Sequence, residues 1–228
     1  MKRDRKINLS LSLITVTFVV IILSYFGLFR YIKLHFMSSK KFIRNYSKLP
    51  RADKDKVVVS FTTTPDKIDK LRPMLNSILD QTVKVDQIAL NIPYMCNGKP
   101  YVIPDDYKDI ANIYRTVKDY GAETSYIPTL LREGESGTKI IYLNDDKIYG
   151  KNLIASLVET SNKNPNKAIY TKDGMNPLGG VLLVKPEFYQ YDVIGHTKEN
   201  FNDSLSGCNL NVGKIKIDTS ETYKSFMI

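Results

Sequence analysis

The chain has 228 residues, of which 43% are hydrophobic and 25% charged, with 12 Gly, 10 Pro and 2 Cys, and this composition excludes a disordered chain, a collagen-like repeat and a disulfide-rich scaffold. The net charge of +9 arises in residues 1–50, which hold ten Lys and Arg against one acidic residue, so the remainder of the chain is electrically balanced. Because a nucleic-acid-binding domain is expected to carry basic side chains on its folded part, we expect no nucleic-acid partner.

An uncharged apolar segment at residues 9–29 follows a short basic tail at residues 1–8. A helix of this length reaches about 30 Å, which is enough to cross the hydrocarbon core of a bilayer. The segment is longer than the apolar core of a signal peptide, and no small-x-small cleavage site follows it. We therefore predict one transmembrane anchor. Charge does not decide its orientation, because basic residues flank both ends.

Two further parts follow the predicted anchor. Residues 30–55 are polar and basic and contain Pro50, which predicts a stem. Residues 56–228 have the right length for one globular domain with a single core. The predicted organisation is therefore a basic tail, an anchor, a stem and one domain.

The predicted domain alternates short apolar strands with helices. Strands are expected at residues 57–61, 87–92, 113–118, 139–143, 180–184 and 215–217, helices are expected to begin near Pro73 and Leu153, and residues 94–106 are expected to be loop. This alternation predicts an α/β domain with a mostly parallel sheet flanked by helices. Such sheets bind ligands where loops leave the carboxyl ends of strands, so the loops after Phe61 and Leu143 form the candidate site.

Asn144, Asp145 and Asp146 directly follow the strand predicted at residues 139–143. In an extended chain, Asn144 and Asp146 would point to one side and Asp145 to the other. Two oxygen ligands spaced in this way suit Mg²⁺ or Mn²⁺ bound against a diphosphate. A solvated turn is the alternative, because Asn and Asp are common after strands.

Five segments resemble, in the same order, the nucleotide-sugar-dependent glycosyltransferases of the A-type fold (family 2-like, Asp-x-Asp type). They are VVVSFTTTPD with Ser77, Gln81, Thr82, Asn91 and Pro93 after it, DYGAETSYIPTL at 119–130, IIYLNDDKIYG at 140–150, PLGGVLLVKPEFY at 177–189, and NFNDSLSGCNLNVGKIKI at 200–217. Each motif is short, and it is their common order that makes the resemblance specific. The resemblance implies a glycosyltransferase-A-like (nucleotide-diphospho-sugar transferase) fold.

The resemblance also implies roles for individual residues of this chain. Phe61, Thr62, Thr63, Asp119 and Asp145 would border the nucleotide-sugar donor, Asp146 and Asn144 would hold Mn²⁺ or Mg²⁺, and Asp203 would be the catalytic base. A carboxylate suits the last role, because it can accept the proton of an attacking sugar hydroxyl.

The chain departs from the family pattern at four positions. Asn144 and Asn202 stand where the family has Asp, and Ala122 and Ser125 stand where it has Pro and a basic residue. The negative charge missing at Asn144 should weaken metal binding, because affinity depends on the charge of the ligands. We therefore expect activity to be reduced.

The function implied by the resemblance is that of a metal-dependent, hexosyltransferase-type enzyme. It would move a sugar from a nucleotide-diphosphate donor to a hydroxyl group on a glycan, lipid or protein. The order of anchor, stem and domain is similar to that of type II Golgi proteins, which predicts a single-pass protein of the Golgi or a related endomembrane. The alternative is a non-catalytic relative that binds carbohydrate or nucleotide at a membrane. A structural protein of an enveloped particle is a third hypothesis.

Overall fold

The computed structural model describes residues 14–21, 27–171, 180–188 and 215–217. The chain divides into two compact units, Met1–Ser38 and Ser39–Ile228. In the first unit, residues 14–21 are helical and helix α2 spans Leu28–Phe36. Among the described residues, no helix has both the length and the apolar character needed to span a bilayer. The anchor at residues 9–29, part of which lies outside the described ranges, stays a prediction.

The second unit begins inside the segment predicted to be a stem. Helix α3 (Ser39–Tyr46) opens it, and the Tyr46 hydroxyl accepts a hydrogen bond from the Val85 backbone N–H at 2.8 Å. Burial raises the pKa of Tyr46 to about 12, because the phenolate would lose its hydration. Further along, Arg51 and Lys84 form a parallel bridge. Residues 39–51 therefore belong to the same compact unit as the sheet.

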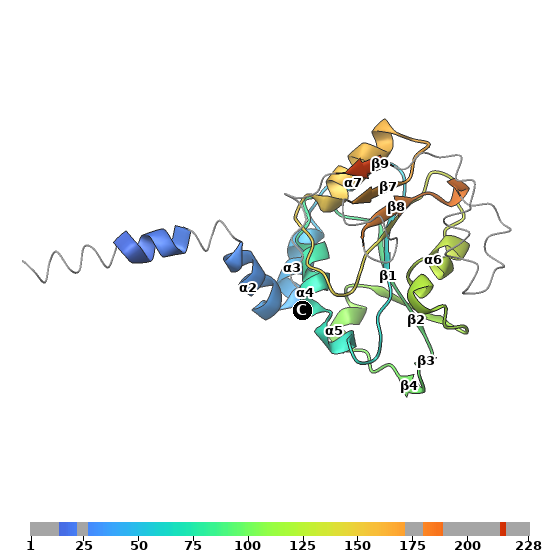
Figure 1. The fold of residues 1–228 in the computed structure, drawn as a ribbon, viewed down its shortest axis with the longest axis horizontal. Coiled ribbons are helices and arrows are strands. Elements are labelled where there is room, and N and C mark those ends of the chain that lie inside the picture. Colours follow the sequence, from blue (N-terminus) through green and yellow to red (C-terminus); the bar gives the residue numbers. More distant parts are fainter. Residues whose placement is uncertain (1–13, 22–26, 172–179, 189–214, 218–228) are drawn as a thin grey trace, which may run out of the picture. The chain divides into compact units, whose positions relative to one another are not determined.

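Within the described ranges, seven strands form one sheet in the order β5-β2-β1-β6-β8-β7-β9 (Figure 1). The strands are β1 (Val57–Phe61), β2 (Gln87–Pro93), β5 (Asn112–Thr116), β6 (Lys139–Tyr142), β7 (Ile169–Thr171), β8 (Leu182–Val184) and β9 (Ile215–Ile217). Neighbouring strands pair in parallel, except that β8 runs antiparallel to both β6 and β7. The predicted α/β fold with a mostly parallel sheet is confirmed.

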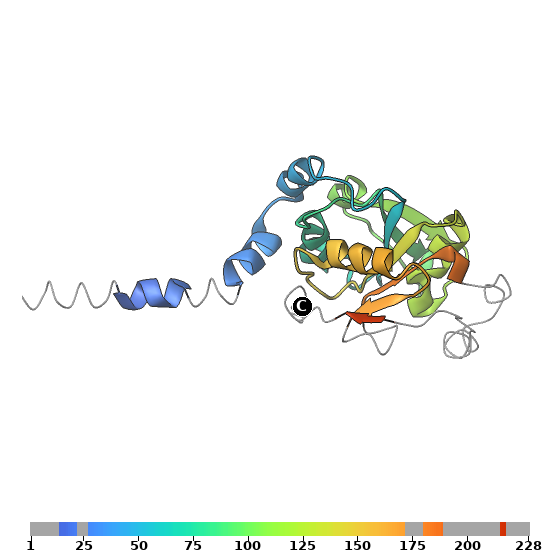
Figure 2. The ribbon, with the colours of Figure 1, turned by 90° about the horizontal axis from the view of Figure 1, so that it is seen from above.

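Helices pack against the sheet because its central strands are mostly apolar and are buried along their whole length. Every residue of β1 and of β6 is buried, as expected for strands covered on both faces. Helix α4 (Arg72–Leu79) lies on one side of β1 and β2, and α6 (Ile127–Arg132) lies on the other (Figures 1 and 2). Pro73 stands in the first turn of α4, where its missing N–H costs no hydrogen bond. Helix α7 (Leu153–Lys163) packs beside β7 and β8.

Residues 94–106, predicted to be loop, contain regular structure. Strands β3 (Met95–Cys96) and β4 (Lys99–Pro100) pair antiparallel around Asn97 and Gly98, whose φ angles are 50° and 73°. Asn-Gly favours such a hairpin turn, because both residues tolerate a positive φ. The short helix α5 (Asp105–Lys108) follows. The loop prediction was wrong for this segment.

Two predicted strands are shorter than expected, and short helical turns occupy neighbouring loops. Strand β5 ends at Thr116, where its pairing with Pro93 of β2 ends, and β8 begins only at Leu182. The turns are the 3-10 helices η1 (Ile68–Lys70), η2 (Gly121–Ser125) and η3 (Pro186–Phe188). The sequence analysis did not predict η2 or the helix α6 that follows it.

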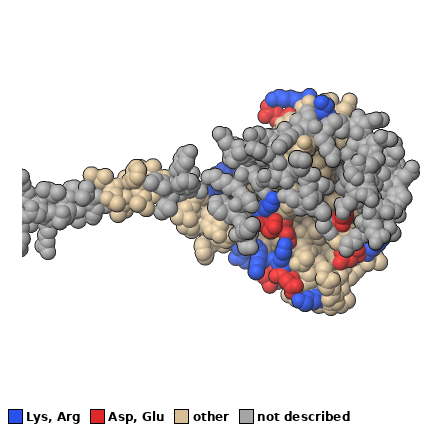
Figure 3. Space-filling model, in the orientation of Figure 1, with Lys and Arg blue, Asp and Glu red and all other residues tan. Residues whose placement is uncertain are grey.

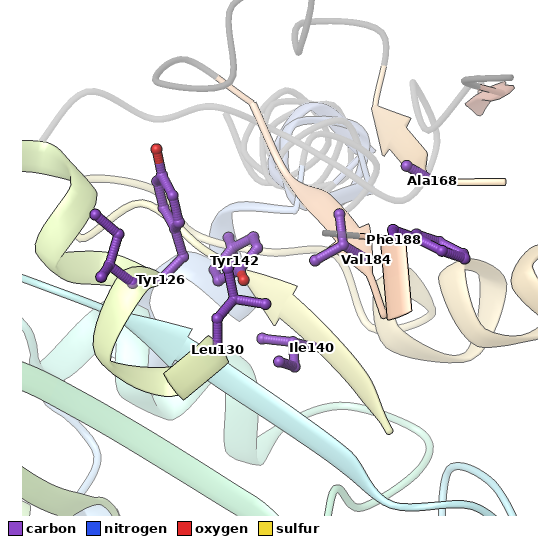
Figure 4. Close-up of a cluster of buried hydrophobic side chains, with 8 residues drawn as sticks. Tyr126, Leu130, Ile140, Tyr142, Ala168, Val184 and Phe188 are labelled. Carbon is purple, nitrogen blue, oxygen red and sulfur yellow. The ribbon is translucent and has the colours of Figure 1, made fainter. Parts of the chain in front are cut away.

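A cluster of buried apolar side chains joins α6 to the middle of the sheet (Figure 4). Its members are Tyr126, Ile127, Leu130, Ile140, Tyr142, Ala168, Val184 and Phe188. The rings of Tyr126 and Tyr142 meet edge to face with centroids 5.0 Å apart, a favourable arrangement for two aromatic rings. The cluster thereby fixes α6 against β6, the strand that leads into Asn144, Asp145 and Asp146.

At the amino end of β6, the buried Lys139 ammonium is held by acidic side chains. It lies 2.9 Å from Asp53 Oδ2 and 3.3 Å from Asp55 Oδ2, both on the segment that leads into β1. Asn162 of α7 donates a further hydrogen bond to Asp53 at 2.9 Å. Burial alone raises the pKa of Asp53, but the hydrogen bonds from Lys139 and Asn162, with the Lys139 charge, bring that pKa below its usual value.

We predict that Asp53→Asn lowers the free energy of unfolding by about 3 kcal/mol at pH 7, because it leaves a buried ammonium with a weaker partner. Since the folded-state pKa is depressed, ionised Asp53 contributes stability above its unfolded-state pKa of about 4, and the contribution is lost as pH falls through the folded-state value. Urea unfolding of the original and variant chains at pH 7 and pH 3 measures this difference. The difference in unfolding free energy between the two chains should be smaller at pH 3 than at pH 7. An equal difference at both pH values would contradict the stabilising role of ionised Asp53.

Candidate functional site

The strand order creates a switch point between β1 and β6. From β1 the chain proceeds outward to β2 and β5, and it then returns to β6 on the other side of β1. Open α/β sheets bind ligands at the carboxyl ends of the strands where the order reverses in this way. The pairing of Ser60 with Tyr142 places the carboxyl ends of β1 and β6 beside each other. The two loops singled out by the sequence therefore leave the sheet at neighbouring points.

A hydrogen bond joins these two loops. The buried Thr63 hydroxyl donates to Asp145 Oδ2 at 2.8 Å, and Lys67 Nζ lies 3.6 Å from Asp145 Oδ1. Both partners of Asp145 come from the segment after β1. Because the Lys67 side chain is half exposed, its attraction to Asp145 is screened by water and is worth little on its own. The hydrogen bond from Thr63 nevertheless orients the Asp145 carboxylate toward the loop after β1.

The three polar residues after β6 do not form an extended segment. Asp145 and Asp146 occupy a turn, so the side-chain alternation predicted for Asn144, Asp145 and Asp146 is wrong. Asp146 is exposed on this turn and Asn144 is partly buried. The backbone of Asn144 is held on both sides by Tyr149, whose hydroxyl accepts from the Asn144 N–H at 2.7 Å and donates to its carbonyl oxygen at 2.9 Å. The turn is thus supported from within its own loop.

Tyr101 is a residue of this edge that the sequence analysis missed. Its hydroxyl donates to the Thr63 carbonyl oxygen at 2.9 Å, and burial raises its pKa, with Cys96 and Asp119 raising it further and Arg115 opposing them. Asp119 is exposed and follows the carboxyl end of β5 by three residues. The Arg115 guanidinium lies 5.6 Å from the centre of the Tyr101 ring. Recognising the Asn-Gly hairpin in the sequence would have drawn attention to this region.

The remaining predicted site residues have different outcomes. Thr62 is partly exposed at the edge, as a donor-binding residue needs to be. The side chain of Phe61 is completely buried, so Phe61 could border the donor only through its backbone, and its place at the donor stays a prediction. The proposed base Asp203, with the neighbouring Asn202, lies outside the described residues.

Buried polar side chains connect two of the segments that carry the resemblance. The Asn91 amide donates to Ser60 Oγ at 2.9 Å and to Thr129 Oγ1 at 2.8 Å, and the two hydroxyls are 2.7 Å apart. Ser60 also donates to the Ser125 carbonyl oxygen. Arg132, which lies at the edge of this network, donates a hydrogen bond to Thr129 Oγ1 at a distance of 3.2 Å. The network ties β1 and β2 to η2 and α6, so these motif residues hold the scaffold together and do not face a ligand.

Charged side chains on the surface of this unit are paired at short range. Figure 3 shows Lys and Arg beside Asp and Glu on the described part of the face in view. Lys99 of β4 lies 2.8 Å from Asp66 in the loop after β1, and Arg72 lies 3.0 Å from Asp106. Such exposed pairs contribute little stability. The first pair connects the hairpin to the loop that carries Thr63.

The turn after β6 suits a divalent cation that is also bound by a phosphate ligand. Asp146 offers an exposed carboxylate and Asn144 an amide oxygen, and Mg²⁺ is usually held by one or two carboxylates together with substrate phosphates. Within the ranges that the structure describes, no three or more His, Cys, Asp or Glu side chains are grouped so as to hold an ion. A cation at this turn would therefore need the phosphates of a ligand to complete its coordination.

Comparisons with known proteins add a distant structural similarity. No model of a known protein family matches the chain, and no curated protein matches it. Among solved structures, the chain is similar to a crystal structure at 1.90 Å described as a "putative nucleotide-diphospho-sugar transferase" from Desulfovibrio desulfuricans G20. The identity is 9%, the match covers 72% of this chain and 80% of that chain, and the TM-score is 0.42. These values are too low for any property of that protein to be transferred to this one.

Thr129→Val should lower the free energy of unfolding by about 2 kcal/mol, because a buried N–H of Asn91 loses its acceptor and Ser60 Oγ loses the hydroxyl that lies 2.7 Å from it. The matched control is Thr160→Val, whose hydroxyl bonds only the Ser156 carbonyl oxygen of its own helix at 2.7 Å. Urea unfolding should show a much smaller loss of unfolding free energy for Thr160→Val than for Thr129→Val. Equal losses in the two variants would contradict a special role for the network.

Proposed function

We propose that this protein is a membrane-anchored glycosyltransferase that takes a sugar from a nucleotide-diphosphate donor. One observation carries the proposal, namely the hydrogen bond between Thr63 and Asp145 at the switch point of the sheet. It joins two separate segments of the sequence that resemble the donor side of such enzymes. The place where they meet is the edge at which open α/β sheets bind their ligands.

The donor would lie along this edge with its nucleotide over Thr62, Thr63 and Asp119. Its diphosphate would lie toward the turn at residues 144–146, where Lys67 brings a positive charge within 3.6 Å of Asp145. Asp146 and the Asn144 amide would hold Mn²⁺ or Mg²⁺, which offsets negative charge on a departing diphosphate. The exposure of Asp119 and Asp146 supports this arrangement, because both carboxylates are accessible to a ligand.

In the transfer, the oxygen of an acceptor hydroxyl forms a bond to the anomeric carbon while the bond from that carbon to the diphosphate breaks. The hydroxyl proton passes to a carboxylate, for which the resemblance implies Asp203. Displacement from the face opposite the diphosphate inverts the anomeric configuration. The acceptor in this proposal is a hydroxyl on a glycan, lipid or protein.

The proposed cellular setting rests on the sequence before the folded domain. The length and lack of charge of residues 9–29 support a single-pass anchor. The order of anchor, connecting segment and domain supports a type II arrangement in the Golgi or a related endomembrane.

A non-catalytic relative that binds carbohydrate or nucleotide is the second candidate function. Asn144 favours it, because the turn holds one carboxylate fewer than the family pattern would supply. Such a protein would bind nucleotide without needing Asp146 or a cation, whereas the enzyme needs both.

We predict that the full-length chain in detergent binds UDP or GDP in the presence of Mn²⁺, and that Asp146→Asn weakens this binding at least about tenfold by removing a charged ligand. Calorimetric titration of each nucleotide, with Mn²⁺ and with EDTA, measures the effect. The control is Asp109→Asn. Asp109 is exposed and precedes β5, so it lies toward the amino ends of the parallel strands, away from the carboxyl ends that form the candidate site.

The outcomes separate the two candidate functions. Binding that needs both Mn²⁺ and Asp146 supports the enzyme and leads to assays of sugar transfer with UDP- and GDP-sugars. Binding that is indifferent to EDTA and to Asp146→Asn supports the non-catalytic relative. If the folded chain binds neither nucleotide, the proposed donor site is wrong.

A further inference from the structure

The loop that follows the Asn144–Asp146 turn is held by two buried side chains of the helix region after β1. Gln81 lies just beyond the end of α4 and is four residues from Ser77, so the two side chains are neighbours on one face. The Gln81 amide nitrogen donates to the Gly150 carbonyl oxygen at 2.6 Å and to the Ser77 carbonyl oxygen at 3.0 Å. Its amide oxygen accepts from the Ile154 N–H at 3.1 Å. One side chain thus bonds three backbone groups.

Gln81 also caps α7 from outside the helix. The first backbone N–H groups of a helix have no partner within it, and Asn152 at the N-cap makes no side-chain capping bond. The bond from Ile154 to Gln81 satisfies one of these groups. The start of α7, and therefore the end of the loop that contains the turn, is set by the side chain of Gln81, just beyond α4.

Ser77 holds the same loop at the neighbouring residue, Tyr149. Its hydroxyl accepts from the Tyr149 N–H at 3.1 Å and donates to the Met74 carbonyl oxygen at 2.6 Å. The Tyr149 hydroxyl in turn bonds both backbone groups of Asn144. A continuous path of hydrogen bonds therefore runs from α4 through Tyr149 to the first residue of the turn.

We propose that Ser77 and Gln81 are positioning residues, which hold the Asn144–Asp146 turn in the geometry that receives the diphosphate of the donor. This inference rests on the proposed function. Apolar side chains of similar size would fill the same buried space without the desolvation cost of a buried amide and hydroxyl. The polar pair instead dictates where three backbone groups of residues 149–154 lie. Groups that orient a ligating residue commonly change ligand affinity as strongly as direct contacts do.

The test compares Gln81→Met and the milder Ser77→Ala with the control Asp53→Asn, all in the full-length chain. Asp53 is paired with Lys139 at the amino end of β6, whereas the turn follows the carboxyl end of this strand. Asp53→Asn therefore destabilises the fold from a point away from the turn. Thermal unfolding first establishes that each variant is folded. Hydrogen exchange by mass spectrometry then reports the protection of residues 144–154 without any ligand, and calorimetry reports UDP and GDP affinity with Mn²⁺.

The expected result is faster exchange in residues 144–154 for Gln81→Met and Ser77→Ala, together with nucleotide affinity lowered roughly 10- to 100-fold. Asp53→Asn should keep both properties, even where its thermal stability falls further. Unchanged exchange in this segment would overturn the inference, and so would faster exchange with unchanged nucleotide affinity. If the unaltered chain binds neither nucleotide, the proposed function fails. Hydrogen exchange is then read on its own, and unchanged exchange in the variants would show that Ser77 and Gln81 do not hold the turn.

Discussion

The arrangement of the candidate site depends on the parallel pairing of β1 with β6. These strands are separated by about eighty residues of sequence, and both are buried along their whole length. Because side chains alternate across a strand, a shift of one residue in β1 would move Ser60 away from α6 and break its bonds to Asn91 and Thr129. At the other end, the ion pair between Lys139 and Asp53 forms only in the same register. Polar contacts at both ends thus fix a register that apolar contacts alone would leave less defined.

The motif residues divide into two groups by their surroundings. Ser77, Gln81, Asn91 and Thr129 are all buried, and their hydrogen bonds go to the backbone and to neighbouring protein side chains. Asp119 and Asp146 are exposed at the carboxyl edge of the sheet. A short motif can therefore persist in a sequence because it holds the scaffold, and the resemblance of this chain to a family is carried mostly by such residues. For this reason, the departure at Asn144 bears on function more directly than the agreement at the buried positions does.

The central strands could be predicted from the sequence because fully buried strands have a simple apolar pattern. Residues 57–61 and 139–143 are such runs, and the site loops follow them. The turn at Asp145 and the place of Tyr101 could not be predicted in this way, since both depend on contacts between distant segments. The hairpin at Asn97 and Gly98 has a local signal, the Asn-Gly pair, which the Pro and Gly content of its surroundings obscured. Helix α6 is six residues long, too short for a clear periodic pattern.

The position of α3 limits how far the domain can travel from an anchor at residues 9–29. The compact unit starts at Ser39, so only residues 30–38 connect the two, and most of them form α2. Even a fully extended chain of nine residues spans only about 30 Å, and a helix of that length about 14 Å. On the proposed function, the short connection would keep the enzyme close to the bilayer surface. Acceptor hydroxyls on lipids, or on the membrane-proximal part of a protein, suit such a short connection.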